Sequence, residues 1–271
     1  MDNKNLSLKA LYISILFALI FSNTSAQIGY VSAENLAHQK TYTSLEDALK
    51  NPTDVIILSL SYRQLSRVPD KIIQFTNLQY LNLEGNNLTT IPISLITLYK
   101  LQYVNLSNNP NLNLKQAFRV LTRLRSLISL GLSENNLTRL PTDIGRLRNL
   151  QLLGLENNQL TRLPIEIGGL RNLKILYLTN NHLSSLPKEI GYLRSLTHLY
   201  LSRNRLSKIP NEIAKCANLV MLDLSRNRLQ SLPYHMIKLK KIKTLDIRKN
   251  SSLKLQQGQI KRMLPNTKIK I

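Results

Sequence analysis

The sequence repeats itself every 23 residues, and this period constrains the fold more than any other feature. The unit that starts at Leu127 reads LISLGLSENNLTRLPTDIGRLRN. Eight further units, some of them degenerate, start at Val55, Leu78, Leu101, Leu150, Leu173, Leu196, Leu219 and Ile242. A fixed period of about 20–50 residues is typical of solenoids, in which each unit packs only on its two neighbours. No unit can bury its apolar side alone, so the units must stack.

Each position of the unit has a physical role. Positions 1, 4 and 6 are apolar, as in Leu150, Leu153 and Leu155, and this alternation indicates a short strand with one buried face. Position 9 is asparagine in every unit but the first, where Arg63 stands. An amide both donates and accepts hydrogen bonds, so stacked asparagines predict a ladder that is interrupted at Arg63. Proline at position 15 favours an extended or turn-like return segment over a long helix.

These features predict an α/β solenoid shaped as a horseshoe. We expect a parallel sheet on the concave side, an extended or short-helical convex side, and helical caps at both ends. The repeats should occupy residues 55–250, with one irregular unit at 101–126 that lacks the proline segment. In that unit we expect a convex helix over Lys115–Leu124. It is interpreted as an old cap absorbed into the array, the alternative being a helix built for a partner.

The two ends of the array need caps, which we place at residues 27–54 and 251–271. Ser44 followed by Asp47 resembles a helix start with a capping box, although the usual glutamate is replaced by aspartate. At the other end we expect an amphipathic helix over Gln256–Leu264 and a closing strand over Lys268–Ile271.

The first 26 residues predict export. Two lysines precede an apolar run of about 12 residues, and small polar residues up to Ala26 follow, which is the layout of a signal peptide. The run is shorter than the roughly 20 residues that span a bilayer. An uncleaved anchor is the competing interpretation. We therefore expect a mature protein outside the cytoplasm, in the periplasm, on the outer surface or outside the cell.

The unit pattern LxxLxLxxNxLxxLPxxIGxLxN resembles that of bacterial leucine-rich-repeat proteins, and the resemblance covers about residues 41–271. The entry TYTSLEDALKNPTDVIILSL and the ending IKRMLPNTKIKI also resemble secreted repeat proteins of pathogenic spirochaetes. The resemblance implies a binding platform that interacts with host molecules. It does not imply one kind of partner, because such arrays carry many different functions.

The residues indicate neither an enzyme nor a metal or cofactor site. Phosphate-loop, HExxH and GxSxG motifs are absent from the sequence. The single cysteine, Cys216, excludes an internal disulfide and falls at the leucine position 21, so it is interpreted as a core residue. Asp223 and Asp246 are neighbours at position 5. Either they form a weak cation site, or they balance nearby Arg and Lys, which is the interpretation we favour.

Strand positions 3 and 5 should line the concave face and form the protein-binding surface. Aromatic and apolar side chains occur there in consecutive units, and such residues are enriched at protein–protein hot spots. We expect an exposed apolar and aromatic patch in the middle of the face. The candidate protein-binding residues are Tyr80, Tyr103, Leu152, Ile175, Tyr177, His198, Tyr200 and Met221.

The chain carries 37 Lys+Arg against 15 Asp+Glu, a formal net charge of +22. Residues 201–271 hold 17 basic and 3 acidic residues, so most of the excess lies in the last quarter. Stacked arginines suit sulfate, phosphate and carboxylate groups. The alternative is a solvated face that aids solubility. The candidate polyanion-binding residues fall at positions 8, 10 and 22: Arg203, Arg226 and Lys249; Arg205 and Arg228; Arg148, Arg171 and Arg194.

Two functions follow from these features. The first is a secreted or surface-exposed protein that binds a host or cell-surface protein through its concave face and sulfated glycans or other polyanions through its basic C-terminal patch. The second is a cell-envelope scaffold that binds anionic lipid or lipopolysaccharide. Specific nucleic-acid binding is disfavoured, because the chain shows an export signal and no nucleic-acid-binding module.

Overall fold

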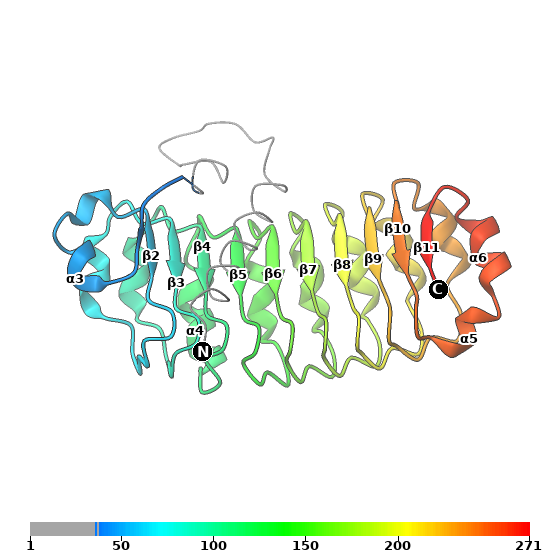
Figure 1. Ribbon diagram of the computed structural model, residues 1–271, viewed down its shortest axis with the longest axis horizontal. Coiled ribbons are helices and arrows are strands. Elements are labelled where there is room, and N and C mark those ends of the chain that lie inside the picture. The colour runs from blue at the N-terminus through cyan, green and yellow to red at the C-terminus, as the bar shows by residue number, and fades with distance from the viewer. Residues whose placement is uncertain (1–35, 37) are drawn as a thin grey trace.

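The repeats form a single curved sheet with its strands in sequence order. A computed structural model describes residues 36 and 38–271, so the predicted export segment and residues 27–35 of the predicted cap lie outside the described residues. Eleven short strands run parallel in this part of the chain (Figure 1). They are β1 Thr41–Tyr42, β2 Ile57–Ser59, β3 Tyr80–Asn82, β4 Tyr103–Asn105, β5 Ser129–Gly131, β6 Leu152–Gly154, β7 Ile175–Tyr177, β8 His198–Tyr200, β9 Met221–Asp223, β10 Thr244–Asp246 and β11 Lys268–Lys270.

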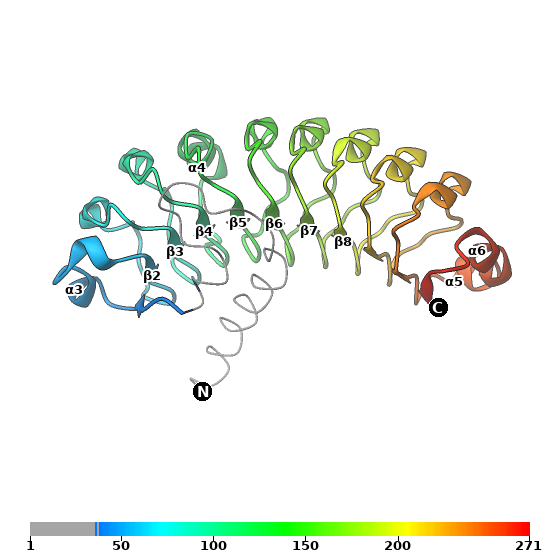
Figure 2. The ribbon, with the colours of Figure 1, turned by 90° about the horizontal axis from the view of Figure 1, so that it is seen from above.

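The chain returns on the convex side through short 3₁₀ helices. Figure 2 shows them on the outer side of the arc, with the strands on the inner side. They are η1 Pro52–Asp54, η2 Asp70–Gln74, η3 Ile93–Thr97, η4 Thr142–Arg146, η5 Ile165–Gly169, η6 Lys188–Tyr192, η7 Asn211–Lys215 and η8 Tyr234–Lys238. Each helix from η2 to η8 begins directly after the proline of position 15, as the fixed φ of proline led us to expect. The predicted horseshoe with a short-helical convex side is confirmed.

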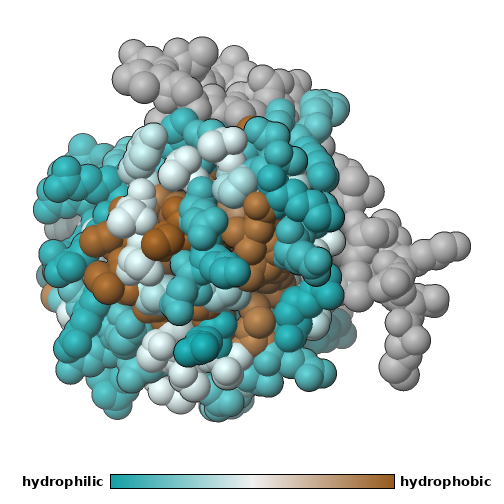
Figure 3. All heavy atoms as spheres, turned by 90° about the vertical axis from the view of Figure 1, so that its left-hand side faces the viewer, coloured by the Kyte–Doolittle hydropathy of each residue, from teal (hydrophilic) through white to brown (hydrophobic). Residues whose placement is uncertain are grey.

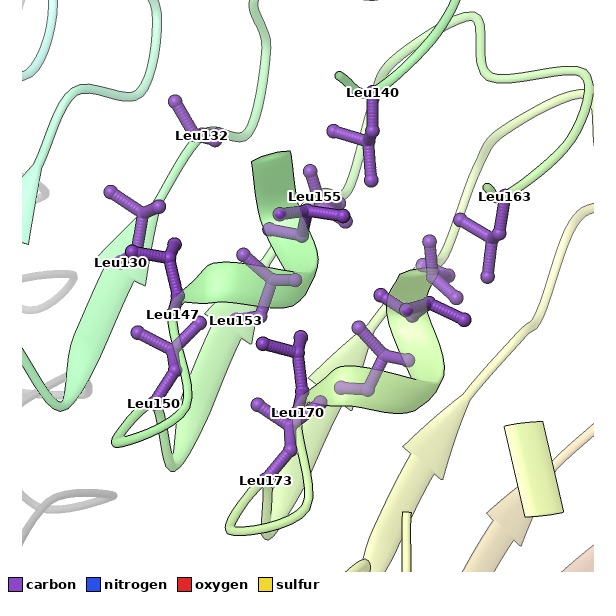
Figure 4. Close-up of a cluster of buried hydrophobic side chains, with 14 of the residues drawn as sticks. Leu130, Leu132, Leu140, Leu147, Leu150, Leu153, Leu155, Leu163, Leu170 and Leu173 are labelled. Atoms are coloured by element: carbon purple, nitrogen blue, oxygen red, sulfur yellow. The ribbon is translucent and has the colours of Figure 1, made fainter. Parts of the chain in front are cut away.

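Leucines from each unit fill the space between the sheet and the 3₁₀ helices. Leu150, Leu153 and Leu155 have no solvent-exposed surface, and Figure 4 shows them packed against leucines of the neighbouring units. Helices pack closely where position 19 is glycine: a Cβ on Gly145 would lie 2.6 Å from the Glu166 carbonyl oxygen. The core is therefore continuous along the array, as stacking requires.

Buried asparagines connect the units along the edge where the strands end. The Asn158 Nδ2 donates to the carbonyls of Leu155 and, in the preceding unit, Leu132, at 3.0 and 2.9 Å. Its Oδ1 accepts from the amides of Asn135 and Leu137, both at 3.0 Å. Each such residue thus satisfies buried backbone groups of its own unit and of the one before it.

The first unit ends the ladder differently. Asn86 still accepts from the amide of Arg63 at 3.0 Å, but Arg63 carries no carboxamide to continue the series. Its guanidinium Nη2 instead donates to the Thr43 carbonyl at 2.8 Å and so connects the first unit to the segment around β1. The predicted interruption of the ladder at Arg63 is confirmed.

The irregular third unit carries a true helix, α4, at Leu114–Leu121. Asn113 caps its start by accepting from the Gln116 amide at 3.0 Å. The helix starts one residue before the expected Lys115–Leu124 range and ends three residues earlier. Thr122 is the C-cap, and its backbone amide and hydroxyl both donate to the Phe118 carbonyl, at 3.1 and 2.7 Å.

Helices flank the sheet at both ends. At the first end, α3 (Leu45–Ala48) starts at Ser44, whose side chain accepts from the Asp47 amide as expected. Figure 3 faces this end and shows apolar surface among hydrophilic side chains. At the other end, α5 (Ser251–Lys254) and α6 (Gln257–Met263) precede β11, which pairs with β10. The helix and the closing strand were both expected there. The division into caps and repeats stays an interpretation.

Candidate functional site

The strand register places the predicted protein-binding residues in two rows. Position 3 aligns Leu152, Ile175, His198 and Met221 on β6 to β9, and position 5 aligns Tyr177 with Tyr200. The rings of Tyr177 and Tyr200 stack with centroids 4.8 Å apart and planes 9° apart, and His198 lies 6.3 Å from Tyr200. The aromatic cluster of Tyr177, His198 and Tyr200 therefore forms as a unit, because neighbouring parallel strands stand about 4.8 Å apart.

A second aromatic pair lies on β3 and β4. The rings of Tyr80 and Tyr103 stand 6.1 Å apart and are tilted by 33°. Between the two pairs, position 5 is occupied by Gly131 on β5 and Gly154 on β6, which carry no side chain. The structure thus separates the predicted aromatic residues into two groups with a gap between them, rather than one unbroken row.

Two of the predicted residues are not exposed. Tyr103 and Ile175 have only 3% and 2% of their surface accessible, so the expectation that Ile175 contributes to an exposed patch is wrong. Ile175 is a short side chain between Leu152 and His198, and lateral packing at the strand spacing removes surface from such a residue. The other predicted residues of these rows are half-buried.

Burial also sets the protonation of this region. It lowers the pKa of His198, whose Nδ1 lies 2.9 Å from the Thr197 hydroxyl, so the imidazole is neutral at pH 7. Burial raises the pKa values of Tyr177 and Tyr200. The aromatic cluster is therefore uncharged at neutral pH, which suits contact with an apolar or aromatic partner surface.

The predicted basic residues lie on two opposite edges of the sheet. Arg194 precedes β8, whereas Arg203 follows it, and in a parallel sheet this relation holds for every unit. The position-22 row (Arg148, Arg171 and Arg194) is therefore at the edge where strands begin. The position-8 row (Arg203, Arg226 and Lys249) and the position-10 pair (Arg205 and Arg228) are at the edge where strands end. All eight residues are exposed, but one small anion cannot bridge the two edges.

Position 8 has a left-handed backbone in every unit, a feature that the sequence analysis missed. Its φ is +55° in both Arg203 and Arg226 and +59° in Lys249. The same position holds Gly85, Asn108, Asn157 and Asn180 in other units, residue types that adopt this region readily. For other residues the left-handed region costs roughly 1–2 kcal/mol. The recurrence of Gly and Asn at position 8 was the sequence signal that could have revealed it.

The two aspartates of position 5 bond to groups of the chain itself. Asp246 pairs with Arg248, with Nη2 and Oδ2 2.6 Å apart, and Asp223 accepts from the Ser225 amide at 2.9 Å. Within residues 36 and 38–271 no group of three or more His, Cys, Asp or Glu side chains is placed to hold a metal. The favoured interpretation, that these aspartates balance nearby cations, agrees with the Asp246–Arg248 pair.

Cys216 is a core residue. It has no exposed surface, its Sγ donates to the Ile190 carbonyl at 3.3 Å, and burial raises its pKa to about 12. The thiolate that a nucleophile or a metal ligand requires is therefore strongly disfavoured.

A hollow of about 580 Å³ lies at the end of the basic edge. Arg228 and Lys249 line it together with Gln230, Ser251 and Ser252, and Ile247 and Ile271 add apolar surface. This hollow was not predicted from the sequence, because it joins the last repeats to α5, and sequence spacing alone does not bring these segments together.

Solved structures with the same architecture come from an animal and from plants. The Toll–Spätzle complex of Drosophila matches at 25% identity over 84% of this chain and 32% of that chain, with a TM-score of 0.64. The Arabidopsis thaliana receptor-kinase ectodomain GASSHO1/SCHENGEN3, in complex with CASPARIAN STRIP INTEGRITY FACTOR 2, matches at 34% identity over 78% and 26%, with a TM-score of 0.61. This chain therefore spans about a third or less of these two receptor chains.

A leucine-rich-repeat protein of Leptospira interrogans also matches, at 25% identity over 86% of this chain and all of that one, with a TM-score of 0.35. No curated protein matches the chain in sequence. None of the helices in the described part is long and apolar enough to cross a membrane. The family described as Leucine rich repeat matches residues 53–112, 171–229 and 194–251, more than half of the chain. The protein therefore belongs to the leucine-rich-repeat family.

Proposed function

We propose that this protein is an exported binding platform whose concave face engages a protein partner, with a host or cell-surface protein as the partner class. The stacked Tyr177 and Tyr200 carry the proposal. Two rigid, uncharged rings on adjacent strands present a large contact area that costs little conformational entropy on binding, as hot spots do. The Toll and plant receptor structures, which are complexes with Spätzle and with CASPARIAN STRIP INTEGRITY FACTOR 2, support a binding role for this architecture.

The test compares tyrosines on the two faces. Tyr177→Ala with Tyr200→Ala removes the stack, whereas Tyr192→Ala with Tyr234→Ala removes two exposed tyrosines of η6 and η8 on the convex side. A pull-down from host extracellular material, at low and high salt, identifies the partner captured by the unsubstituted chain. We expect the concave variant to weaken that binding at least tenfold, because a hot-spot truncation costs about 2 kcal/mol or more. Equal weakening by both variants would falsify the assignment of the face.

Export and the second binding activity belong to the same proposal. The N-terminal pattern up to Ala26 supports export, and sequencing of the mature chain should then start at Gln27. The exposed basic residues of the C-terminal quarter support binding of polyanions such as sulfated glycans. On a heparin column, changing Arg203, Arg205, Arg226 and Arg228 to Glu should lower the salt needed for elution. Unchanged elution would reject this patch.

An envelope scaffold is the alternative function. Cell fractionation separates the two: retention in the envelope, with no protein in the medium or accessible at the surface, would favour a scaffold that binds anionic lipid or lipopolysaccharide.

A further inference from the structure

We propose that the position-8 row and the position-10 pair form one strip for a linear sulfated polysaccharide, and that the hollow beside Arg228 and Lys249 seats one of its sugar units. The inference rests on the polyanion part of the proposed function and deepens it, because it names the edge, the residues and the ligand class. It excludes the position-22 row from the site.

The backbone at position 8 gives the first argument. This position is left-handed in all nine units, and four of the first six units fill it with Gly or Asn, which suit it. The last three units fill it with Arg203, Arg226 and Lys249, which do not. A residue held against its backbone preference points to a role for its side chain.

Contacts within the described residues do not explain why Arg203, Arg226 and Lys249 occupy position 8. In earlier units the position-8 side chains bond to one another: Asn157 donates to Glu134 at 3.3 Å, and Asn180 donates to Asn157 at 2.9 Å. Among the described residues, no carboxylate lies within ion-pair distance of the cations of the position-8 row. These side chains therefore face solvent with their charges uncompensated, and a bound anion would relieve their mutual repulsion.

The spacing of the cations suits a chain of anionic groups. Consecutive units stand about 4.8 Å apart, so the position-8 row is a line of three cations. Arg205 and Arg228 form a second, shorter line beside it, because the intervening Asn204 and Asn227 are buried in the ladder. Arginine forks hold sulfate and carboxylate groups with two hydrogen bonds each. A linear polyanion can therefore bind several forks at once.

The hollow favours a saccharide over a lipid surface. Besides Arg228 and Lys249 it presents the neutral side chains of Gln230, Ser251 and Ser252 and the apolar Ile247. A sulfated sugar needs this mixture, since it carries an anionic group, hydroxyls and an apolar ring face. A flat bilayer cannot enter a hollow, and its anionic head groups need only the charges.

The experiment measures heparin affinity by titration calorimetry with the full mature chain and two matched variants. The strip variant is Arg203→Asn, Arg226→Asn and Lys249→Asn; the control is Arg148→Asn, Arg171→Asn and Arg194→Asn, which removes the same charge from the opposite edge. We expect at least a tenfold loss for the strip variant and less than a threefold loss for the control. Equal losses would overturn the strip.

The unfolding temperature distinguishes a binding role of the position-8 cations from a structural role. Asparagine suits the left-handed backbone, so the strip variant should unfold at the same temperature as the unsubstituted chain or about 2–4 °C higher. Arg205→Asn with Arg228→Asn is the control, since it removes two charges at residues that are not left-handed. A strip variant that unfolds earlier would contradict the backbone argument.

The hollow and the ligand class have their own tests. Gln230→Ala with Ser252→Ala changes no charge and should weaken a sulfated hexasaccharide at least threefold; an unchanged affinity would reject the seat. Double-stranded DNA, or vesicles of anionic lipid, that bind as tightly as heparin at equal salt would reject a polysaccharide as the ligand. If the unsubstituted chain binds no heparin at all, the polyanion part of the proposed function fails, and not the choice of edge alone.

Discussion

The edge where the strands end has an acidic part and a basic part on the same backbone. Glu84, Glu134 and Glu156 lie at positions 7 and 8 in the second, fourth and fifth units, and Arg203, Arg226 and Lys249 lie at position 8 in the last three. The acidic part is internally satisfied: Tyr62 donates to Glu84 at 3.1 Å and Ser133 to Glu156 at 2.7 Å. The basic part has no such partners among the described residues. Side chains that make no hydrogen bond or ion pair within the chain are the ones available to a ligand.

The largest expected effect tests whether both parts rest on one scaffold. Asn158→Ala lies in the acidic part and Asn227→Ala in the basic part, and both remove an amide that bonds to buried carbonyls of two units. We expect each to lower the free energy of unfolding by at least about 3 kcal/mol, because each buried group left unsatisfied costs roughly 1–3 kcal/mol. Urea unfolding measures this. A loss below about 1 kcal/mol at one site would show that water replaces the amide there.

A smaller effect should follow from extending the basic part into the acidic one. Glu134→Arg places a further cation at position 8, three units before Arg203 and beyond Asn157 and Asn180. It should raise heparin affinity about two- to fivefold, the size of one exposed charge interaction. Glu189→Arg on η6 makes the same charge change on the convex side. A similar gain from both substitutions would mean that heparin senses net charge rather than the edge.

The smallest effect concerns protonation in the acidic part. Burial raises the pKa of Glu156 above its ordinary 4.5, so the folded chain holds this proton more tightly than the unfolded one. Stability therefore falls as the pH rises from the unfolded pKa through the folded one. Glu156→Gln keeps an acceptor for Ser133 and should stabilise the chain at pH 7, with the gain vanishing below about pH 4. Thermal unfolding across this range checks it, and a loss of stability at pH 7 would contradict it.

The period and the residue types were enough to predict the architecture. The features that define the fold act within one unit or between neighbouring units, so a local pattern is enough to predict them. Alternating leucines predict the sheet, the asparagine of position 9 predicts the ladder, and the proline of position 15 predicts the 3₁₀ return. The end of α4 was placed three residues too far, because Leu124 continues the apolar pattern and is buried although it lies beyond the helix.

The candidate site was predicted less completely. The register brought Tyr177 and Tyr200 together because rows follow from the period. It could not reveal that Ile175 is buried, since burial depends on the sizes of neighbours in adjacent rows. The opposite edges of the position-22 and position-8 residues, by contrast, could have been predicted, because the expected strand lies between these two positions in every unit. The hollow depends on how α5 meets the last repeats, and no repeat rule describes that junction.

The ladder also governs how such a chain can change its length during evolution. Each asparagine reaches back to the preceding unit, so whole units can be gained or lost while every rung finds its partner. The third unit shows a further freedom: Asn135 lies 26 residues after Asn109, yet its Oδ1 still accepts from the Asn109 amide at 2.6 Å. The extra residues are accommodated on the convex side, where α4 replaces a 3₁₀ helix. The convex segments can therefore change in length and structure while the order of side chains along the concave face stays the same.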